Sequence, residues 1–180
     1  MRVELRLAGA GGQGLITAGI ILAEACAKYT DLNVAQTQSY GPESRGGASR
    51  ADVIISSNEI DYPEVKAPDV LVVMTQEAAD KYIPGVKDGG TVIVDTTYVK
   101  QLPEAQSKGF KVIEFPISGK ARELGREIVA NIVALGLLTE ATGIVPNDAV
   151  MAGVLNRVPK GTEELNKQAF AAGVEAAKGL

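Results

Sequence analysis

Hydrophobic and polar positions divide the chain into alternating strand-like and helix-like segments. Between residues 3 and 8, apolar side chains alternate with charged ones, which is the period of a half-buried strand. Residues 15–29 are apolar on nearly all sides of a helical projection, and this predicts a largely buried helix. The same pattern predicts a short helix at 76–83 and further strands at 33–38, 51–57, 69–75, 91–95 and 111–117.

The last third of the chain is predicted to be helical. An apolar segment at 127–142 is followed by Gly143, a residue type that commonly ends a helix as its C-cap. A second helix is predicted to begin near Asn147 and Asp148, which are favourable N-cap types, and to end before Pro159. Thr162 is predicted to cap a third helix.

The order of the elements predicts an α/β layered fold with a mostly parallel sheet and a helical C-terminal part. Only a glycine-rich loop separates the strands at 33–38 and 51–57. Because a parallel crossover usually needs a helix, these two strands are predicted to be antiparallel, which makes the sheet mixed. No internal repeat or linker interrupts the pattern, so we expect residues 1–180 to form a single domain.

The composition excludes several classes of protein. The formal net charge is −4, which argues against nucleic-acid binding because that function needs an excess of Lys and Arg. No apolar run approaches the roughly 20 residues of a membrane span. The N-terminal segment has the pattern of a strand and not of a signal peptide, so we expect a cytoplasmic location.

The chain lacks the residues of most catalytic and metal sites. It contains no histidine, which removes the commonest general base and the commonest metal ligand. The single cysteine, Cys26, cannot hold an iron–sulfur cluster by itself and is interpreted as a small core residue. We therefore expect no catalytic residue and no metal site in this chain, and a binding role or a place in a larger assembly instead.

The segment "LAGAGGQGLITAG" at residues 7–19 carries the glycine spacing of a dinucleotide-binding loop. Such a loop turns sharply after a strand and presents the N–H groups of a helix N-terminus to an anion. The full fingerprint also needs an acidic residue at the end of the second strand, where this chain has Gln38 and Ser39. Binding of NAD is therefore disfavoured, and the glycines either face another anion or only allow close packing.

The loop "SYGPESRGGASR" at residues 39–50 is a second candidate for binding. It combines Tyr40 with the guanidinium groups of Arg45 and Arg50. Because it follows a strand of a layered fold, we expect it near the glycine loop, where two arginines suit a phosphate or a carboxylate. The alternative interpretation is a solvated loop with an internal pair between Glu43 and Arg45.

Several separated motifs together resemble one protein family. The stretches "RLAGAGGQGLITAGIILAEA", "QTQSYGPESRGGASRADVIIS", "DYPEVKAPDVLVVMTQEAADKY" and "ARELGREIVANIVALGLL" are similar to the gamma subunit of 2-oxoacid:ferredoxin oxidoreductases. The "SYGPESRGGASR" variant most resembles the 2-oxoglutarate type. The resemblance covers nearly the whole chain, so it is far more specific than the glycine motif alone.

This resemblance implies a Rossmann-like three-layer fold and a non-catalytic subunit near the coenzyme A site. The complete enzyme would oxidatively decarboxylate a 2-oxoacid onto coenzyme A and reduce ferredoxin. Thiamine diphosphate, Mg²⁺ and iron–sulfur clusters would be held by partner subunits, namely alpha, beta and a ferredoxin-like delta. The candidate residues for coenzyme A contact or subunit interface are Gly9, Gly11, Gly12, Gln13, Gly14, Tyr40, Arg45 and Arg50.

Two other functions stay open on the residues alone. One is a stand-alone oxidoreductase that binds a nicotinamide or flavin nucleotide. The other is a regulatory module that senses a phosphorylated ligand.

Overall fold

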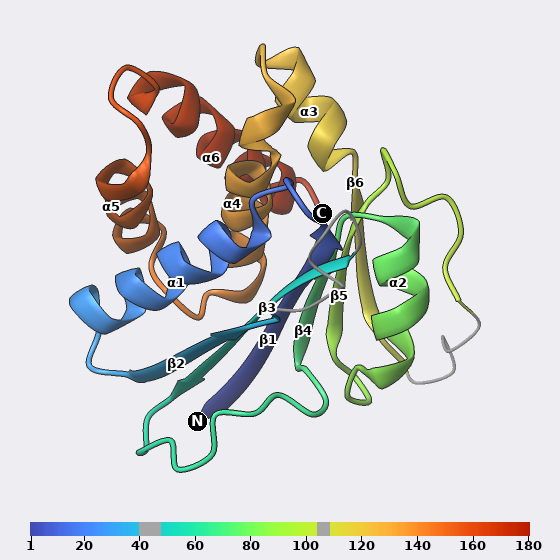
Figure 1. Cartoon of the computed structure of the whole chain (residues 1–180), viewed down its shortest axis with the longest axis vertical. Coiled ribbons are helices and arrows are strands. Elements are labelled where there is room, and N and C mark those ends of the chain that lie inside the picture. Colours follow the sequence, from blue (N-terminus) through green and yellow to red (C-terminus); the bar gives the residue numbers. More distant parts are fainter. Residues whose placement is uncertain (40–47, 104–108) are drawn as a thin grey trace.

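The computed structural model describes residues 1–39, 48–103 and 109–180, and in them a mixed sheet is flanked by helices (Figure 1). The strands lie in the order β2-β3-β1-β4-β5-β6. Their bounds are β1 Arg2–Ala10, β2 Asn33–Gln38, β3 Ala48–Ser56, β4 Val70–Val73, β5 Thr91–Asp95 and β6 Lys111–Phe115. The helices are α1 Leu15–Tyr29, α2 Gln76–Tyr82, α3 Ile117–Glu123, α4 Ala130–Thr142, α5 Asn147–Arg157 and α6 Glu163–Lys178, with short 3-10 segments η2 Ile83–Gly85 and η4 Glu127–Val129.

The third strand, β3, lies between β1 and β2. It pairs antiparallel with both, while β1, β4, β5 and β6 pair in parallel. The predicted antiparallel pairing of the second and third strands is therefore confirmed. Since β3 separates the two strands, β2 is not the neighbour of the strand that carries the glycine loop.

Helices cover the two faces of the sheet unequally. Figure 1 shows α1, α4, α5 and α6 on one side and α2 on the other. Alternate residues of the central strands point to the two sides: Val70 and Val72 join the larger core, whereas Leu71 and Val73 join the smaller core against α2. The predicted three-layer α/β fold is confirmed.

Close backbone contact joins α4 and α6. A Cβ atom added to Gly173 would lie 2.1 Å from the Val133 carbonyl oxygen, and one added to Gly136 would lie 2.1 Å from that of Phe170. Only glycine allows this approach, because the backbone of the facing helix occupies the place of a side chain. The ten residues from Ala130 to Thr139 are all buried, since this part of α4 lies between α6 and the rest of the core.

Most predicted elements are present, with three differences. Strand β3 begins at Ala48, so Arg50 belongs to a strand and not to the loop; backbone pairing of Ala8 with Arg50 extends the ladder. Residues after Phe115 turn into α3 and do not continue the strand to Ile117. Thr162 precedes α6, but its hydroxyl donates to the Pro159 carbonyl oxygen and does not cap the helix.

The predicted end of the 127–142 helix is confirmed, because Gly143 follows α4 with a φ of 63°, in the left-handed region. In the described part of the chain, no helix combines the length and the apolar character needed to cross a membrane.

Candidate functional site

A cleft of about 720 Å³ lies at the carboxyl ends of β1, β4 and β5. The helices that follow β1 and β4 cover opposite faces of the sheet (Figure 1). Open α/β sheets bind ligands at such a point, where the chain leaves adjacent strands in opposite directions. The cleft is lined by Ala10, Gly11, Gly12, Gln13, Thr75, Gln76, Tyr98, Ser118, Glu127, Ile128 and Ala130.

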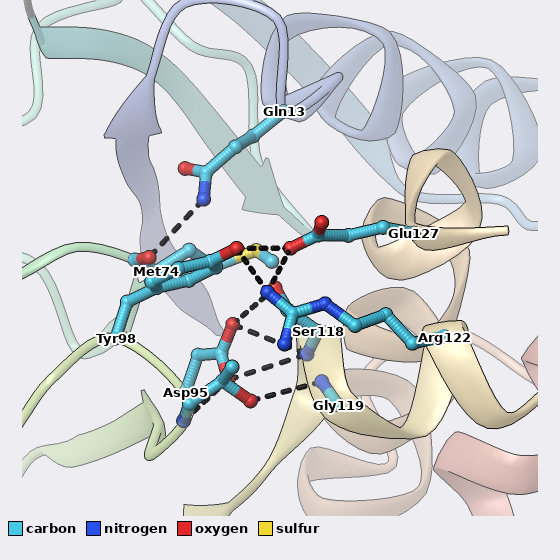
Figure 2. Close-up of polar contacts among 9 residues, drawn as sticks. Gln13, Met74, Asp95, Tyr98, Ser118, Gly119, Arg122 and Glu127 are labelled. Atoms are coloured by element: carbon cyan, nitrogen blue, oxygen red, sulfur yellow. Dashed lines mark hydrogen bonds and ion pairs between the residues drawn. The ribbon is translucent and has the colours of Figure 1, made fainter.

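The side chain of Gln13 joins two walls of this cleft. Its Oε1 accepts a hydrogen bond of 2.7 Å from the Ala10 backbone N–H. Its Nε2 donates one of 3.2 Å to the Met74 carbonyl oxygen, the bond that Figure 2 shows. One amide therefore links the loop after β1 to the residue after β4. The Ala10 N–H therefore has its hydrogen-bond partner within the protein.

Two of the loop glycines have packing roles. A Cβ on Gly9 would lie 2.2 Å from Gln13 Oε1, so this glycine makes room for the amide. Gly14 has a φ of 76°, and a Cβ there would lie 2.6 Å from Asn131 Nδ2 of α4. That nitrogen donates to the Gly14 carbonyl oxygen at 3.1 Å. Gly14 thus fixes the start of α1 against α4.

A buried carboxylate fixes the start of α3 beside the cleft. Asp95, at the end of β5, is fully buried. It accepts hydrogen bonds from the Thr97 N–H at 3.0 Å and from the Ser118 N–H and Oγ, the last at 2.6 Å. The Thr97 hydroxyl accepts the Gly119 N–H at 2.9 Å. These bonds satisfy the first N–H groups of α3 and explain why a helix forms where the sequence predicted a continuing strand.

Tyr98, Arg122 and Glu127 form a polar cluster at the rim of the cleft (Figure 2). The Tyr98 hydroxyl donates to Glu127 Oε1, and Arg122 Nη2 donates to the same hydroxyl at 2.5 Å and to Glu127 at 3.1 Å. The hydrogen bond to Glu127 raises the pKa of Tyr98. The hydrogen bonds from Tyr98 and then Arg122 lower the pKa of Glu127. The phenol therefore stays protonated and the carboxylate stays charged over a wide pH range.

Arg50 lies outside the residues that line the cleft. It stands on β3, where its Nε is 3.6 Å from Asp52 Oδ2, and its guanidinium lies 5.9 Å from the centre of the Tyr82 ring. Asp52 is mainly bound by Arg6, through two hydrogen bonds of 2.8 and 3.0 Å. Arg6 and Asp52 are both buried and face each other across β1 and β3.

The structure thus brings Gly11, Gly12 and Gln13 to one cleft, with Gly9 and Gly14 behind them. Tyr40 and Arg45 lie outside the described residues. Sequence reasoning missed Asp95, Tyr98, Arg122 and Glu127. Only Asp95 carried a signal, since a charged residue directly after an apolar parallel strand falls at the binding edge of a sheet.

No group of three or more His, Cys, Asp or Glu side chains within the described ranges is arranged to hold a metal ion. The one cysteine, Cys26, is fully buried in α1, and burial raises the pKa of its thiol. Neither property suits an iron–sulfur ligand, which must be a thiolate.

A family model described as pyruvate ferredoxin/flavodoxin oxidoreductase matches residues 4–176. Among individual proteins, the chain is 48% identical over 182 residues to the 2-oxoglutarate synthase subunit KorC of Methanocaldococcus jannaschii. That alignment covers 100% of this chain and 96% of the relative.

Two solved structures share the fold. The gamma subunit of a keto/oxoacid ferredoxin oxidoreductase from Geobacter sulfurreducens PCA is similar with a TM-score of 0.90 and 46% identity, over 99% of this chain and 98% of that one. A 2-oxoglutarate:ferredoxin oxidoreductase from Magnetococcus marinus, with 2-oxoglutarate, coenzyme A and succinyl-CoA bound, is similar with a TM-score of 0.89 and 26% identity. There the match covers 99% of this chain but 31% of the other, so the same unit also occurs within a longer chain.

Proposed function

The chain belongs to the pyruvate ferredoxin/flavodoxin oxidoreductase family, and we propose that it is the gamma subunit of a 2-oxoglutarate:ferredoxin oxidoreductase. This enzyme would oxidatively decarboxylate 2-oxoglutarate to its coenzyme A thioester and pass two electrons to ferredoxin. The observation that carries the proposal is the end-to-end similarity, at 48% identity, to a subunit of a 2-oxoglutarate synthase.

We infer that this chain leaves the redox chemistry to its partner subunits. Its sequence holds no histidine and one cysteine, and that cysteine is buried. A single buried cysteine cannot hold an iron–sulfur cluster, so we assign the clusters to other chains and place thiamine diphosphate and Mg²⁺ with them. An alpha, a beta and a ferredoxin-like delta subunit are the candidates. We place this complex in the cytoplasm and take residues 1–180 as one domain of it.

The cleft at the carboxyl ends of β1, β4 and β5 forms one wall of the coenzyme A site. Its floor is the glycine loop, which leads directly into α1, a helix whose N-terminus has no side-chain cap. No Lys or Arg lines the cleft among the described residues, although Arg122 lies directly behind its rim. The wall thus offers backbone donors, a tyrosine and apolar surface. When coenzyme A is bound, the thioester chemistry itself is supplied by the coenzyme and the partner subunits.

The test is to purify the tagged chain from its native host and to assay the complex that comes with it. We expect reduction of ferredoxin that depends on both coenzyme A and 2-oxoglutarate, with a higher kcat/KM for 2-oxoglutarate than for pyruvate or 2-oxoisovalerate. A chain that purifies without a thiamine-dependent oxidoreductase, or a complex that prefers pyruvate, would contradict the proposal.

The same preparation tests the alternatives. Submicromolar binding of NAD(H), NADP(H) or FAD to the purified chain would favour a stand-alone oxidoreductase. The strand order argues against this function, because β3 stands between the glycine loop and the strand that should carry the ribose-binding acid.

A further inference from the structure

Ile128 is a large apolar residue on the surface between two hollows. It belongs to η4, is 64% exposed, and lines both the cleft and a second groove of about 210 Å³. Apolar side chains dominate the wall of this second groove: Ile21, Val129, Ile132, Val158, Pro159 and Leu165. Contiguous exposed apolar surface rimmed by polar residues marks sites of protein–protein contact, and Ile128 together with this groove forms such a surface.

A free cation stands beside this apolar surface. Arg126 lines the same groove and is exposed, and it makes no ion pair with any residue in the described ranges. The neighbouring arginines are neutralised within the chain: Arg157 binds Glu24 at 2.7 and 3.0 Å, and Arg122 binds Glu127. The unsatisfied charge at the groove is therefore positive.

We propose that Ile128 and Arg126 form the docking surface for another subunit of the oxidoreductase. The occupant would be a segment with an apolar side chain that enters the groove beside Ile128 and a carboxylate that binds Arg126. Residues that dominate binding energy cluster near the centre of an interface in well-packed pockets, and Arg is one of the enriched types. This inference rests on the proposed function, because it assumes that the chain works within a complex.

The charge pattern selects a different chain over a second copy. In a two-fold dimer each surface faces its own copy. The counter-ion of Arg126 would then have to come from the same surface of the copy, and the described lining of the groove contains no Asp or Glu. An acidic segment of a different chain would supply this counter-charge.

The relation between groove and cleft also gives the docked subunit a position. Because Ile128 lines both hollows, a chain that covers it also borders the cleft that we assign to coenzyme A. The docked subunit would therefore close one side of that site.

The first experiment compares variants of the full chain in the native complex. Ile128→Asp and Arg126→Glu are each produced with a tag, and the oxidoreductase subunits that co-purify are measured by mass spectrometry. Affinity for the subunits released from the wild-type complex is measured as well. We expect Ile128→Asp to weaken binding by about 30-fold or more and Arg126→Glu by about 10-fold, with unchanged thermal unfolding.

The matched control is Val112→Asp, which adds the same charge at another exposed apolar residue. Val112 is 39% exposed on β6 and lines neither hollow. Full assembly of both test variants, or an equal loss in the Val112→Asp control, would overturn the docking surface. Failure of the proposed function is distinct, because the wild-type chain would then bring no oxidoreductase subunit with it.

A second experiment identifies the neighbour directly. In Ile128→Cys the new thiol is exposed, whereas Cys26 is fully buried, so a thiol-reactive photo-crosslinker attaches at position 128. We expect crosslinks to one other subunit of the complex. Crosslinks to a second copy of this chain, or none in the assembled complex, would overturn the proposal.

Discussion

Gln13 and Met74 lie 61 residues apart in the chain, yet one hydrogen bond of 3.2 Å joins them at the base of the candidate cleft. The same amide accepts the Ala10 N–H at 2.7 Å. The glycine loop is thus held by its own glutamine, which binds backbone groups at the end of β1 and directly after β4.

Replacing Gln13 tests this bridge. Gln13→Ala removes two hydrogen bonds and leaves two backbone groups without partners, so we expect a loss of about 1–3 kcal/mol in the free energy of unfolding. Gln13→Glu keeps the acceptor but cannot donate to the Met74 oxygen, and it should also be destabilised. Chemical denaturation measures both variants. If Gln13→Glu were as stable as wild type, the contact with Met74 would contribute nothing.

The contact between α4 and α6 predicts a strong effect at a single glycine. In Gly173→Ala the new Cβ meets the Val133 oxygen at 2.1 Å, and the helices must separate. We expect a loss of about 3 kcal/mol or more. Gly179→Ala is the matched control at the end of the same helix, where the nearest atom lies at 3.7 Å, and it should leave the unfolding midpoint nearly unchanged.

Breaking the buried pair of Arg6 and Asp52 should cost more stability than breaking an exposed ion pair. Asp52→Ala leaves the Arg6 guanidinium buried without its main counter-ion and should cost about 3–5 kcal/mol. Glu175→Ala, which breaks the exposed pair with Lys178, should cost less than about 1 kcal/mol. Equal effects in urea denaturation would show that burial of the first pair has no energetic consequence.

The rim cluster predicts a change in titration. Hydrogen bonding lowers the pKa of Glu127, so the stability that this carboxylate contributes is present above its ordinary pKa and is lost as pH falls through the lowered value. Tyr98→Phe removes the larger cause, and the pKa of Glu127 should rise toward its ordinary value. Carbon-detected NMR titration of the Glu127 carboxyl measures the shift, with the exposed Tyr62→Phe as control. An unchanged Glu127 pKa in Tyr98→Phe would contradict the hydrogen bond.

Arg50, which stands on β3 outside the lining of the cleft, allows a test of its role in coenzyme A binding. If its partly exposed guanidinium helps to attract the coenzyme's phosphates, Arg50→Ala should raise the KM for coenzyme A more than the KM for 2-oxoglutarate. Arg157→Ala, which removes an exposed arginine paired with Glu24, is the control and should leave the KM for coenzyme A unchanged. Equal KM values for coenzyme A in both variants and wild type, with the complex assembled, would remove Arg50 from the site.

Local patterns in the sequence were sufficient to predict most of the fold. The alternation in β1, the apolar runs of β4 and β5, and Gly143 after α4 each act through neighbouring residues, so they are visible without the structure. Because no helical segment separates β2 from β3, the sequence also predicted their antiparallel pairing correctly. The short helix α3 was missed because its first N–H groups depend on Asp95, which lies 22 residues before Ile117.

The family resemblance was confirmed by the end-to-end match, whereas the site residues remain predictions. The sequence located the glycine loop but could not indicate that Gln13 would reach β4, because that contact depends on the packing of β1 beside β4. Tyr98 lies 24 residues before Arg122 and 29 before Glu127, so no local pattern connects it to them. Contacts of this kind are set by tertiary structure, and they account for most of what was missed.

The position of β3 limits how the chain can be redesigned. It pairs with β1 from Arg2 to Ala10, so β2 lies two strand spacings, about 10 Å, from the strand that leads into the glycine loop. An acidic residue introduced at Gln38 would therefore meet β3, and not the ribose of a nucleotide held at that loop. Conversion of this scaffold into a dehydrogenase would require a new strand order, which substitutions in the loop cannot provide.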